Sequence, residues 1–419
     1  MPRTSVGILF LLAAPLPVAA AQSSPLALAT AVLAERDSQL VAFRRDLHRH
    51  PEVSDDERRT STEIAARLLS VGFEVRTDVG GYGIVAVLRG ARPGPMVAFR
   101  ADMDAVRSDA PDPVEFSSEI PGVRHICGHD VHATIGLALA EAFAAARDRL
   151  EGSVMLVFQP AEETGTGARA MLADEVFAGE PPVAIYAVHT APLEVGTLGT
   201  MAGGLMAGRD RVTVEVRGKG EVAATVDAAR AIIEREETAG LDPAERSWPT
   251  DVVAVNGVDL RQVADDGWDV SAGLAIADSA TRERVRTTLL RDLSALDRAD
   301  VKVTVRYDAK LVPGVTNDSV LVARADAAIA HALGPEALRP MTGVVPGFSE
   351  DFGSFQEQVP GVMYFLGVSN TAKGTRGMPH SPDYVADEGA IQVGARAMLA
   401  VMLERMTEGE RETQKASSK

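Results

Sequence analysis

The stretch VMLVFQPAEE at residues 154–163 joins a short apolar run to two adjacent carboxylates. Because the run is continuous rather than alternating, it predicts a strand that is buried on both faces of a sheet. Similar apolar runs occur at residues 84–88, 96–99 and 185–188. Helical segments expected at 133–150 and 387–405 would cover the faces of this sheet. The pattern predicts an α/β domain with a mostly parallel sheet covered by helices.

Length and charge set broad limits on the kind of protein. A chain of 419 residues that is 46% hydrophobic can build a large core, and we expect more than one domain. The net charge of −17 argues against a nucleic-acid partner, since no basic stripe is present to displace phosphate counterions.

The first 21 residues are typical of an export signal. Arg3 precedes an apolar stretch at residues 6–16, and three alanines at 19–21 form a small-residue cleavage site before Gln22. The apolar stretch is too short and too interrupted by proline to span a membrane. We therefore expect a periplasmic or secreted mature protein that begins near Gln22 and has no membrane partner.

A helix is expected after residue 54. Ser54 followed by Glu57 predicts a capping box that opens this helix. Its apolar stripe includes Ile64, Leu68 and Leu69, and Gly72 ends it.

The middle of the chain has a different pattern. Residues 212–217 and 301–306 alternate strictly between valine and polar residues, which predicts strands with one solvent-exposed face. Helices expected at 222–237 and 281–295, with weaker strands near Val252 and Val270, complete a ferredoxin-like βαββαβ order.

The domain boundaries follow from this insertion. Gly203-Gly204 and Pro313-Gly314 are natural hinges on either side of it. We predict a signal peptide, a discontinuous catalytic domain, an inserted lid and a disordered tail, at residues 1–21, 30–208 with 314–406, 209–313 and 407–419 respectively.

The segment RHICGHDVH at residues 124–132 holds the only cysteine of the chain. Cys127 and His129, two positions apart, can reach one cation from an irregular loop, and both suit zinc-like metals. The alternative is a buried cysteine beside surface histidines. A single cysteine forms no internal disulfide, and a thiol in an oxidising compartment is a liability unless it is buried or metal-bound, which favours the metal site.

Further candidate ligands follow the predicted buried strands. Asp102 and Asp104 follow the run at 96–99, and His189 follows the run at 185–188. Polar residues at the carboxyl ends of parallel strands converge at one edge of the sheet. His380 lies in a loop bracketed by Pro379 and Pro382.

The pair Glu162-Glu163 stands directly after the run at 154–158. One carboxylate can bind metal while the other accepts a proton from water. A solvated loop is the alternative for the pair, and a core histidine is the alternative for His189. Asp104 can either orient a ligand or cap the next helix.

These segments together resemble the M20 metallopeptidases, in particular the branch of aminoacylases, hippurate hydrolases and auxin-conjugate (IAA-amino acid) amidohydrolases. The resemblance spans nearly the whole mature chain in family order. Its matching segments are RRDLHRHPE (44–52), RADMDA (100–105), CGHDVH (127–132), QPAEE (159–163), SEDF (349–352) and HSP (380–382).

The resemblance implies a two-metal hydrolase of small amides. Two divalent ions (Zn, Mn or Co) would activate a water that Glu162 deprotonates as general base, and Glu162 would pass the proton to the leaving amine. We count Asp104 with Glu162 among the catalytic residues. The substrate would be an N-acyl amino acid or a similar peptide-like amide. The implied metal ligands are Cys127, His129, Glu163, His189 and His380.

The inserted domain departs from the family pattern. Family members carry Gly-Lys-Gly-Gly-His-Ala and a later Pro-His pair, but residues 218–224 read GKGEVAA, without the histidine that helps to stabilise the oxyanion. The family's Asn-Val-Ile-Pro segment and following arginine, associated with the substrate carboxylate, are not recognisable around 263–275. Such a donor is worth about 3 kcal/mol of barrier. The change also argues against a homodimer formed through the lid. Candidate replacement donors are Arg209, Arg211 and Lys219.

Two functions follow from these observations. The first is an exported metal-dependent amidohydrolase, which the intact Glu162 favours. The second is a weakly active or inactive metal-binding relative that serves as a small-ligand binding protein, which the altered lid favours.

Overall fold

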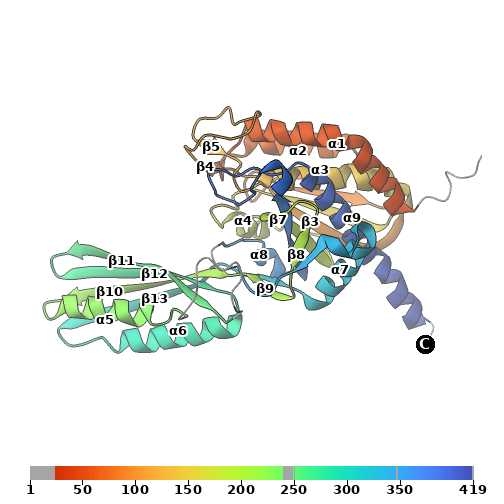
Figure 1. Cartoon of the computed structure of the whole chain (residues 1–419). Coiled ribbons are helices and arrows are strands. Elements are labelled where there is room, and N and C mark those ends of the chain that lie inside the picture. The colour runs from red at the N-terminus through yellow and green to blue at the C-terminus, as the bar shows by residue number, and fades with distance from the viewer. Residues whose placement is uncertain (1–23, 239–248, 250, 346–347, 418–419) are drawn as a thin grey trace, which may run out of the picture.

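The computed structural model describes residues 24–238, 249, 251–345 and 348–417, with the side chains beyond residue 407 left aside. Two lobes are visible, a large one and a slender one that extends from it (Figure 1). The expected signal peptide at 1–21 lies outside the described residues.

The large lobe is built on an eight-stranded sheet with the order β1-β2-β6-β3-β7-β16-β8-β15. The central strands β6, β3, β7 and β16 run parallel. Strands β1 and β2 pair antiparallel to their neighbours, and β8 pairs antiparallel to β16 but parallel to β15. This confirms the mostly parallel sheet. The strands are β1 Glu74–Val79, β2 Gly83–Arg89, β3 Arg92–Asp102, β6 Glu151–Gln159, β7 Ala184–Glu194, β8 Leu198–Thr200, β15 Leu338–Pro340 and β16 Gly361–Ser369.

Helices cover both faces of this sheet, which explains the continuous apolar runs. Val97 and Phe99 of β3 pack into one core with α1, α2, α3, α7 and α9, whereas Met96 and Ala98 pack into another with α4 and α8. The helices are α1 Pro25–Arg49, α2 Arg58–Ser70, α3 His129–Ala146, α4 Gly167–Ala173, α7 Ser319–Leu333, α8 Gly353–Gln356 and α9 Gly389–Ser417.

Several local predictions are wrong. The capping box does not form, because the Ser54 hydroxyl donates to Asp104 and Glu57 accepts from the backbone of Ala161. Leu69, assigned to the apolar stripe of α2, is 59% exposed. The tail expected to be disordered from residue 407 is helical as far as Ser417.

The slender lobe is a four-stranded antiparallel sheet with the order β11-β12-β10-β13. Helices α5 and α6 cover one face and enclose the valines of β10 in a separate core. The ferredoxin-like order is confirmed. Its elements are β10 Gly208–Gly218, α5 Val222–Glu234, β11 Val253–Ala264, β12 Gly267–Ile276, α6 Ser279–Ser294 and β13 Val301–Val312.

The slender lobe, which is the predicted lid, joins the large lobe through two neighbouring connections. Strands β9 (Gly203–Met206) and β14 (Val315–Asn317) pair antiparallel just outside the lid. A side chain on Gly208 would collide with the backbone of Gly314, so these glycines allow the two connections to run in close contact. The lid sheet begins at Gly208, the first residue of β10, and ends at Val312, the last residue of β13.

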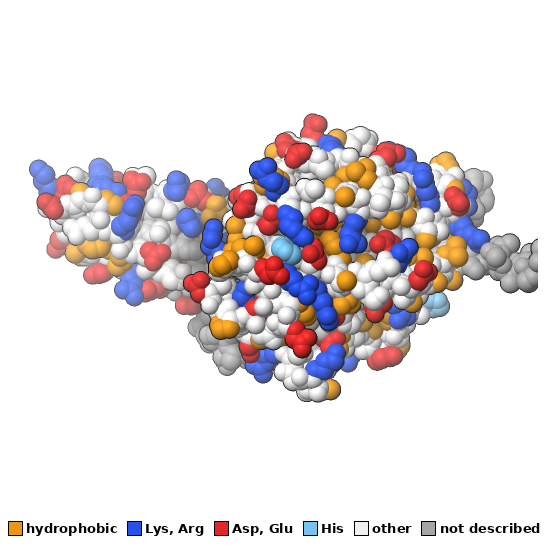
Figure 2. All heavy atoms as spheres, turned by 90° about the horizontal axis from the view of Figure 1, so that it is seen from above, with side chains coloured by type: hydrophobic (Ala, Val, Ile, Leu, Met, Phe, Trp, Pro, Cys, Tyr) orange, Lys and Arg blue, Asp and Glu red, His pale blue; other side chains and the backbone are white. Residues whose placement is uncertain are grey.

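The remaining elements are short. They are β4 Val106–Arg107, β5 Val123–Arg124 and the 3₁₀ turns Arg147–Arg149, Pro335–Ala337 and Thr371–Lys373. None of the helices in the described part of the chain is both long enough and apolar enough to cross a membrane. Seen from above, acidic and basic side chains are interspersed over both lobes rather than gathered into a basic stripe (Figure 2).

Candidate metal centre

The predicted ligands meet at the carboxyl edge of the parallel strands. Glu162 and Glu163 follow β6, and His189 lies within β7. Cys127 precedes α3, and His129 is the first residue of that helix, so α3 begins four residues before the predicted position. Gly128 allows this turn: its φ is 89°, and a side chain there would collide with Tyr384 and Thr190.

Two groups of possible ligands share Cys127. Its thiol forms one group with His129 and His189 and another with Glu163 and His380, and the ligand atoms of each group lie within 4.8 Å of one another. The Cys127 Sγ is 3.5 Å from the His189 Nε2, and the His380 Nε2 is 3.4 Å from a Glu163 oxygen. All five predicted ligands are thus brought together.

Two unpartnered atoms show that this arrangement fits a cation. The His129 Nε2 and the Glu163 Oε1 are buried without any hydrogen-bond partner, and they lie 3.7 Å apart. Buried polar atoms normally have a partner, and a shared cation would satisfy both. Thiolate, imidazole and carboxylate form a donor set that suits zinc-like divalent ions.

The histidines are oriented from behind. The His189 Nδ1 donates to the backbone carbonyl of Thr190 at 2.8 Å, which leaves its Nε2 facing Cys127. The His129 Nδ1 lies 3.1 Å from Asp104, whose other oxygen accepts from Ser54 and from the backbone of Glu163. Asp104 therefore orients a ligand rather than caps a helix.

Burial and nearby charges shift the pKa values of the candidate ligands. Burial lowers the pKa of His129, but Asp102 and Asp104 outweigh it and raise that pKa to about 10. Burial lowers the pKa of His189 to about 3. Burial and nearby carboxylates, chiefly Glu163, raise the pKa of the Cys127 thiol. A cation bound here must displace the protons of Cys127 and His129.

Glu162 occupies a different position from its neighbour. It is 6% exposed, and its Oε2 lies 3.7 Å from the His129 Nε2. Burial, and then the charge of Glu350, raise its pKa well above the usual value for a glutamate. The preceding residue, Ala161, has a φ of 50° and donates its backbone N–H to Glu57 at 2.8 Å. This left-handed turn sets the directions of the two carboxylates.

A buried chain of polar residues supports the site from β3. Asp102 accepts from the His132 Nδ1 at 2.6 Å, and the His132 Nε2 accepts from the backbone of Thr190 at 2.8 Å. The Thr190 hydroxyl in turn donates to the carbonyl of Cys127. Asp102 thus holds the His132 ring in place, and that ring in turn holds the backbone of Thr190. Sequence reasoning missed Thr190, and its place directly after His189 was the only signal.

Arg100 is the second support that was missed. Its guanidinium is fully buried and donates to Asp102 at 2.6 Å and to Glu350 at 2.8 Å. It also contacts Gln159 and Asp351. The resemblance had included residues 349–352 without giving them a role, and the structure places Glu350 and Asp351 against Arg100.

The three candidate donors of the lid are spread along β10. Arg209 lies at the end next to the large lobe, Arg211 is two residues further, and Lys219 follows the far end of the strand. At about 3.3 Å per residue, Lys219 is roughly 30 Å from Arg209 along the strand. Only the end that holds Arg209 is close to the metal ligands.

Comparisons with known proteins agree with this geometry. The model of peptidase family M20/M25/M40 matches residues 98–404. An N-acetylcysteine deacetylase of Bacillus subtilis (strain 168) is 31% identical over 385 residues, which are 87% of this chain and 97% of the relative. The IAA-amino acid hydrolase ILR1-like 4 of Arabidopsis thaliana is 30% identical over 375 residues, which are 85% of this chain and 83% of the relative.

Among solved structures, the Bacillus subtilis YXEP protein is described as a dinuclear metal-binding peptidase of the M20 family. It superposes with a TM-score of 0.76 at 26% identity and covers 89% of this chain and 99% of its own.

Proposed function

This chain belongs to peptidase family M20/M25/M40, and we propose that it hydrolyses N-acyl amino acids with Glu162 as the general base. Its relatives are hydrolases of amide bonds, which confirms the resemblance seen in the sequence. What we propose beyond family membership is the class of substrate and the role of each residue in the site.

One observation carries it. Two ligand groups share the thiol of Cys127, and Glu162 belongs to neither of them, although its carboxylate lies close to one ligand of each, His129 and Glu163. A buried carboxylate with a raised pKa, next to a cation site, is suited to accept a proton from water. That division between the two glutamates supports a hydrolytic site over a simple metal store.

The reaction follows from these positions. Divalent cations bound here would supply Lewis acidity to the scissile carbonyl and to the attacking water. Glu162 takes a proton from the water while the oxygen of that water bonds to the carbonyl carbon. Glu162 then gives that proton to the amine nitrogen as the C–N bond breaks. The products are a carboxylate and a free amino acid.

The substrate class is inferred from the relatives. The names N-acetylcysteine deacetylase and IAA-amino acid hydrolase both denote cleavage of an acyl group from an amino acid. We propose the same class for this chain, with the acyl group and side chain left open.

The test measures metal content and hydrolysis in one sample. The protein is loaded with Zn, Mn or Co and offered N-acetyl, N-benzoyl and dipeptide substrates. We expect turnover of at least one N-acyl amino acid that requires the metal. Bound metal without turnover of any substrate would instead support the second function, a binding protein.

The assignment of ligands can be tested separately. Since Cys127 belongs to both ligand groups and His380 to one, Cys127→Ser should weaken both metals and His380→Ala only one. Metal content after dialysis against a chelator would show the difference. Equal metal loss in the two variants would contradict the shared thiol.

We also propose export, on the composition of residues 1–21 alone. N-terminal sequencing of the mature protein should begin near Gln22. A mature protein that still begins at Met1 would rule out a cleaved signal.

A further inference from the structure

Arg209 is an exposed cation at the junction of the two lobes. It is the second residue of β10, on the end of the lid next to the large lobe. Its guanidinium has no hydrogen bond or ion pair among the residues that the structure describes. By contrast, the buried Arg100 of β3 is fully engaged by carboxylates and Gln159. Arg209 is therefore available to a ligand.

Strand register directs Arg209 toward the metal centre. It stands directly opposite Val312 of β13, so the two side chains lie on one face of the sheet. A Cβ placed on Gly165 would be 2.6 Å from the Val312 Cγ2, which shows that Val312 packs on the turn that carries Glu162 and Glu163. Arg209 thus lies beside that turn.

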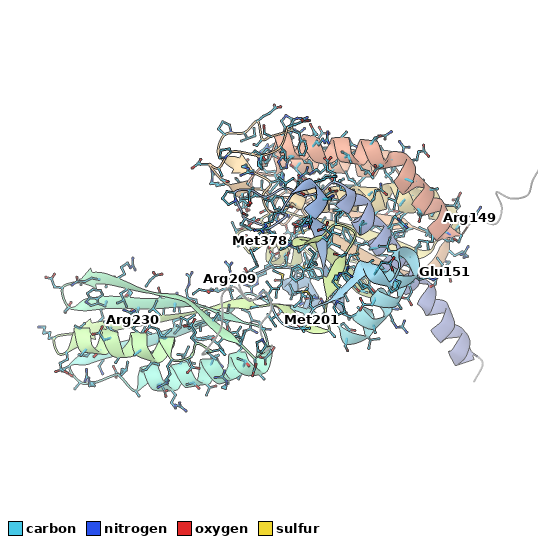
Figure 3. The ribbon with its side chains drawn as sticks, viewed as in Figure 1. Arg149, Glu151, Met201, Arg209, Arg230 and Met378 are labelled. Atoms are coloured by element: carbon cyan, nitrogen blue, oxygen red, sulfur yellow. The ribbon has the colours of Figure 1, made fainter. Side chains whose placement is uncertain are left out.

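The loop of His380 also lies near Arg209. Figure 3 shows Arg209 where the lid meets the large lobe, with Met378, two residues before His380, on the large lobe nearby. The turn that carries Glu162 and Glu163 and the loop that carries His380 therefore both lie near Arg209.

The neighbours of Arg209 do not share this position. The adjacent Asp210 points to the opposite face, where Arg282 and Tyr307 bind it inside the lid. Arg211 is on the same face as Arg209 but stands opposite Asp308, a carboxylate of its own sheet. Arg209 stands between Val312 and Ala275, neither of which offers it a partner.

We propose that Arg209 binds the carboxylate of the substrate and makes the enzyme selective for anionic over neutral acyl amides. The proposal rests on the proposed function, because an N-acyl amino acid carries a carboxylate next to its scissile amide. That anion must approach Glu162 and Glu163, which repel it. An arginine can hold a carboxylate through two parallel hydrogen bonds, and Arg209 is free to do so.

The test compares one anionic and one neutral ligand. N-acetylmethionine and N-acetylmethioninamide differ only in the group that Arg209 would bind. We expect Arg209→Ala to reduce kcat/KM for the acid by about 10- to 100-fold and to leave that for the amide nearly unchanged. Arg209→Lys should restore part of the preference. Arg230→Ala, which removes an exposed arginine on the distant α5, is the matched control.

A binding measurement separates this inference from the proposed function. Metal-loaded Glu162→Gln protein, with and without Arg209→Ala, is titrated with the same two ligands by calorimetry. The acid should lose about 10- to 100-fold in affinity and the amide should not. This readout needs no turnover, so it decides the role of Arg209 even if the parent hydrolyses neither compound. Equal losses for both ligands, no loss for either, or no binding of N-acetylmethionine would overturn the inference.

Discussion

The two sheets of this protein use charged residues in opposite ways. In the large sheet, Arg100 and Asp102 of β3 are fully buried, and each is held by a partner from a distant segment, Glu350 and His132 respectively. In the lid sheet, Arg217, Asp269 and Arg261 pair on the solvent-exposed face. A buried charge without its partner is costly, whereas an exposed one is solvated by water.

This difference explains where the sequence departs from its family. The metal-binding edge of the large sheet holds every ligand that the resemblance implies, and buried partners such as Asp104 orient these ligands from behind. The lid has lost its histidine at 218–224 without losing its fold, since its core is the apolar face under α5 and α6. The lid is therefore the part in which specificity can change most easily.

The largest expected effect is on catalysis at the buried edge. Glu162→Gln should reduce kcat by about 10²- to 10⁴-fold, because the amide side chain cannot accept the proton of the attacking water. Metal content should stay at the parent level, since Glu162 belongs to neither of the two groups that share Cys127. Steady-state kinetics and metal analysis on one sample check both statements. A variant as active as the parent would remove Glu162 from the mechanism.

The second prediction concerns stability of the buried network. Arg100→Met should lower the free energy of unfolding by about 3–5 kcal/mol, because Asp102, Glu350 and Asp351 would lose their shared cation. Thermal unfolding of the metal-free protein measures the change. A shift no larger than that of a surface substitution would show that these carboxylates do not depend on Arg100.

How far the sequence predicts this architecture depends on the range of the interactions. Continuous apolar runs such as 154–158 indicate burial on both faces of a strand from the local sequence alone, so the positions of these strands could be predicted. Ligands next to those strands could be placed as well. The roles of Ser54 and Glu57 could not, because Glu57 binds the backbone of Ala161, 104 residues away, and Ser54 binds Asp104. A local capping motif cannot show such distant partners.

The same limit applies to the supports of the metal centre. Asp102 looks like a ligand from its position at the end of β3, and only the fold shows that His132 and Arg100 occupy its oxygens. The start of α3 was missed because Gly128, rather than a serine or aspartate, forms its N-cap.

The third prediction is that metal affinity rises with pH. The pKa of His129 is raised to about 10, so this imidazole is protonated at neutral pH until a cation displaces the proton. Affinity should therefore increase from pH 6 to pH 8, by about tenfold per pH unit for each displaced proton. Competition with a chelator at several pH values measures the slope. Asp104→Asn should make it shallower, and an affinity independent of pH would contradict the assignment of His129.

The smallest effect is expected on the exposed face of the lid. Arg217 is 38% exposed on the side chain and donates to Asp269 at 2.6 Å, but Asp269 also accepts from Arg261. Arg217→Met should therefore cost only about 0.2–1 kcal/mol of unfolding free energy, and added salt should reduce that cost further. The measurement is the same thermal unfolding used for Arg100→Met, at low and high salt. If Arg217→Met were as destabilising as Arg100→Met, hydration of Asp269 would not be compensating for the loss of Arg217. That result would mean that exposed residues of the lid cannot be replaced without a large loss of stability.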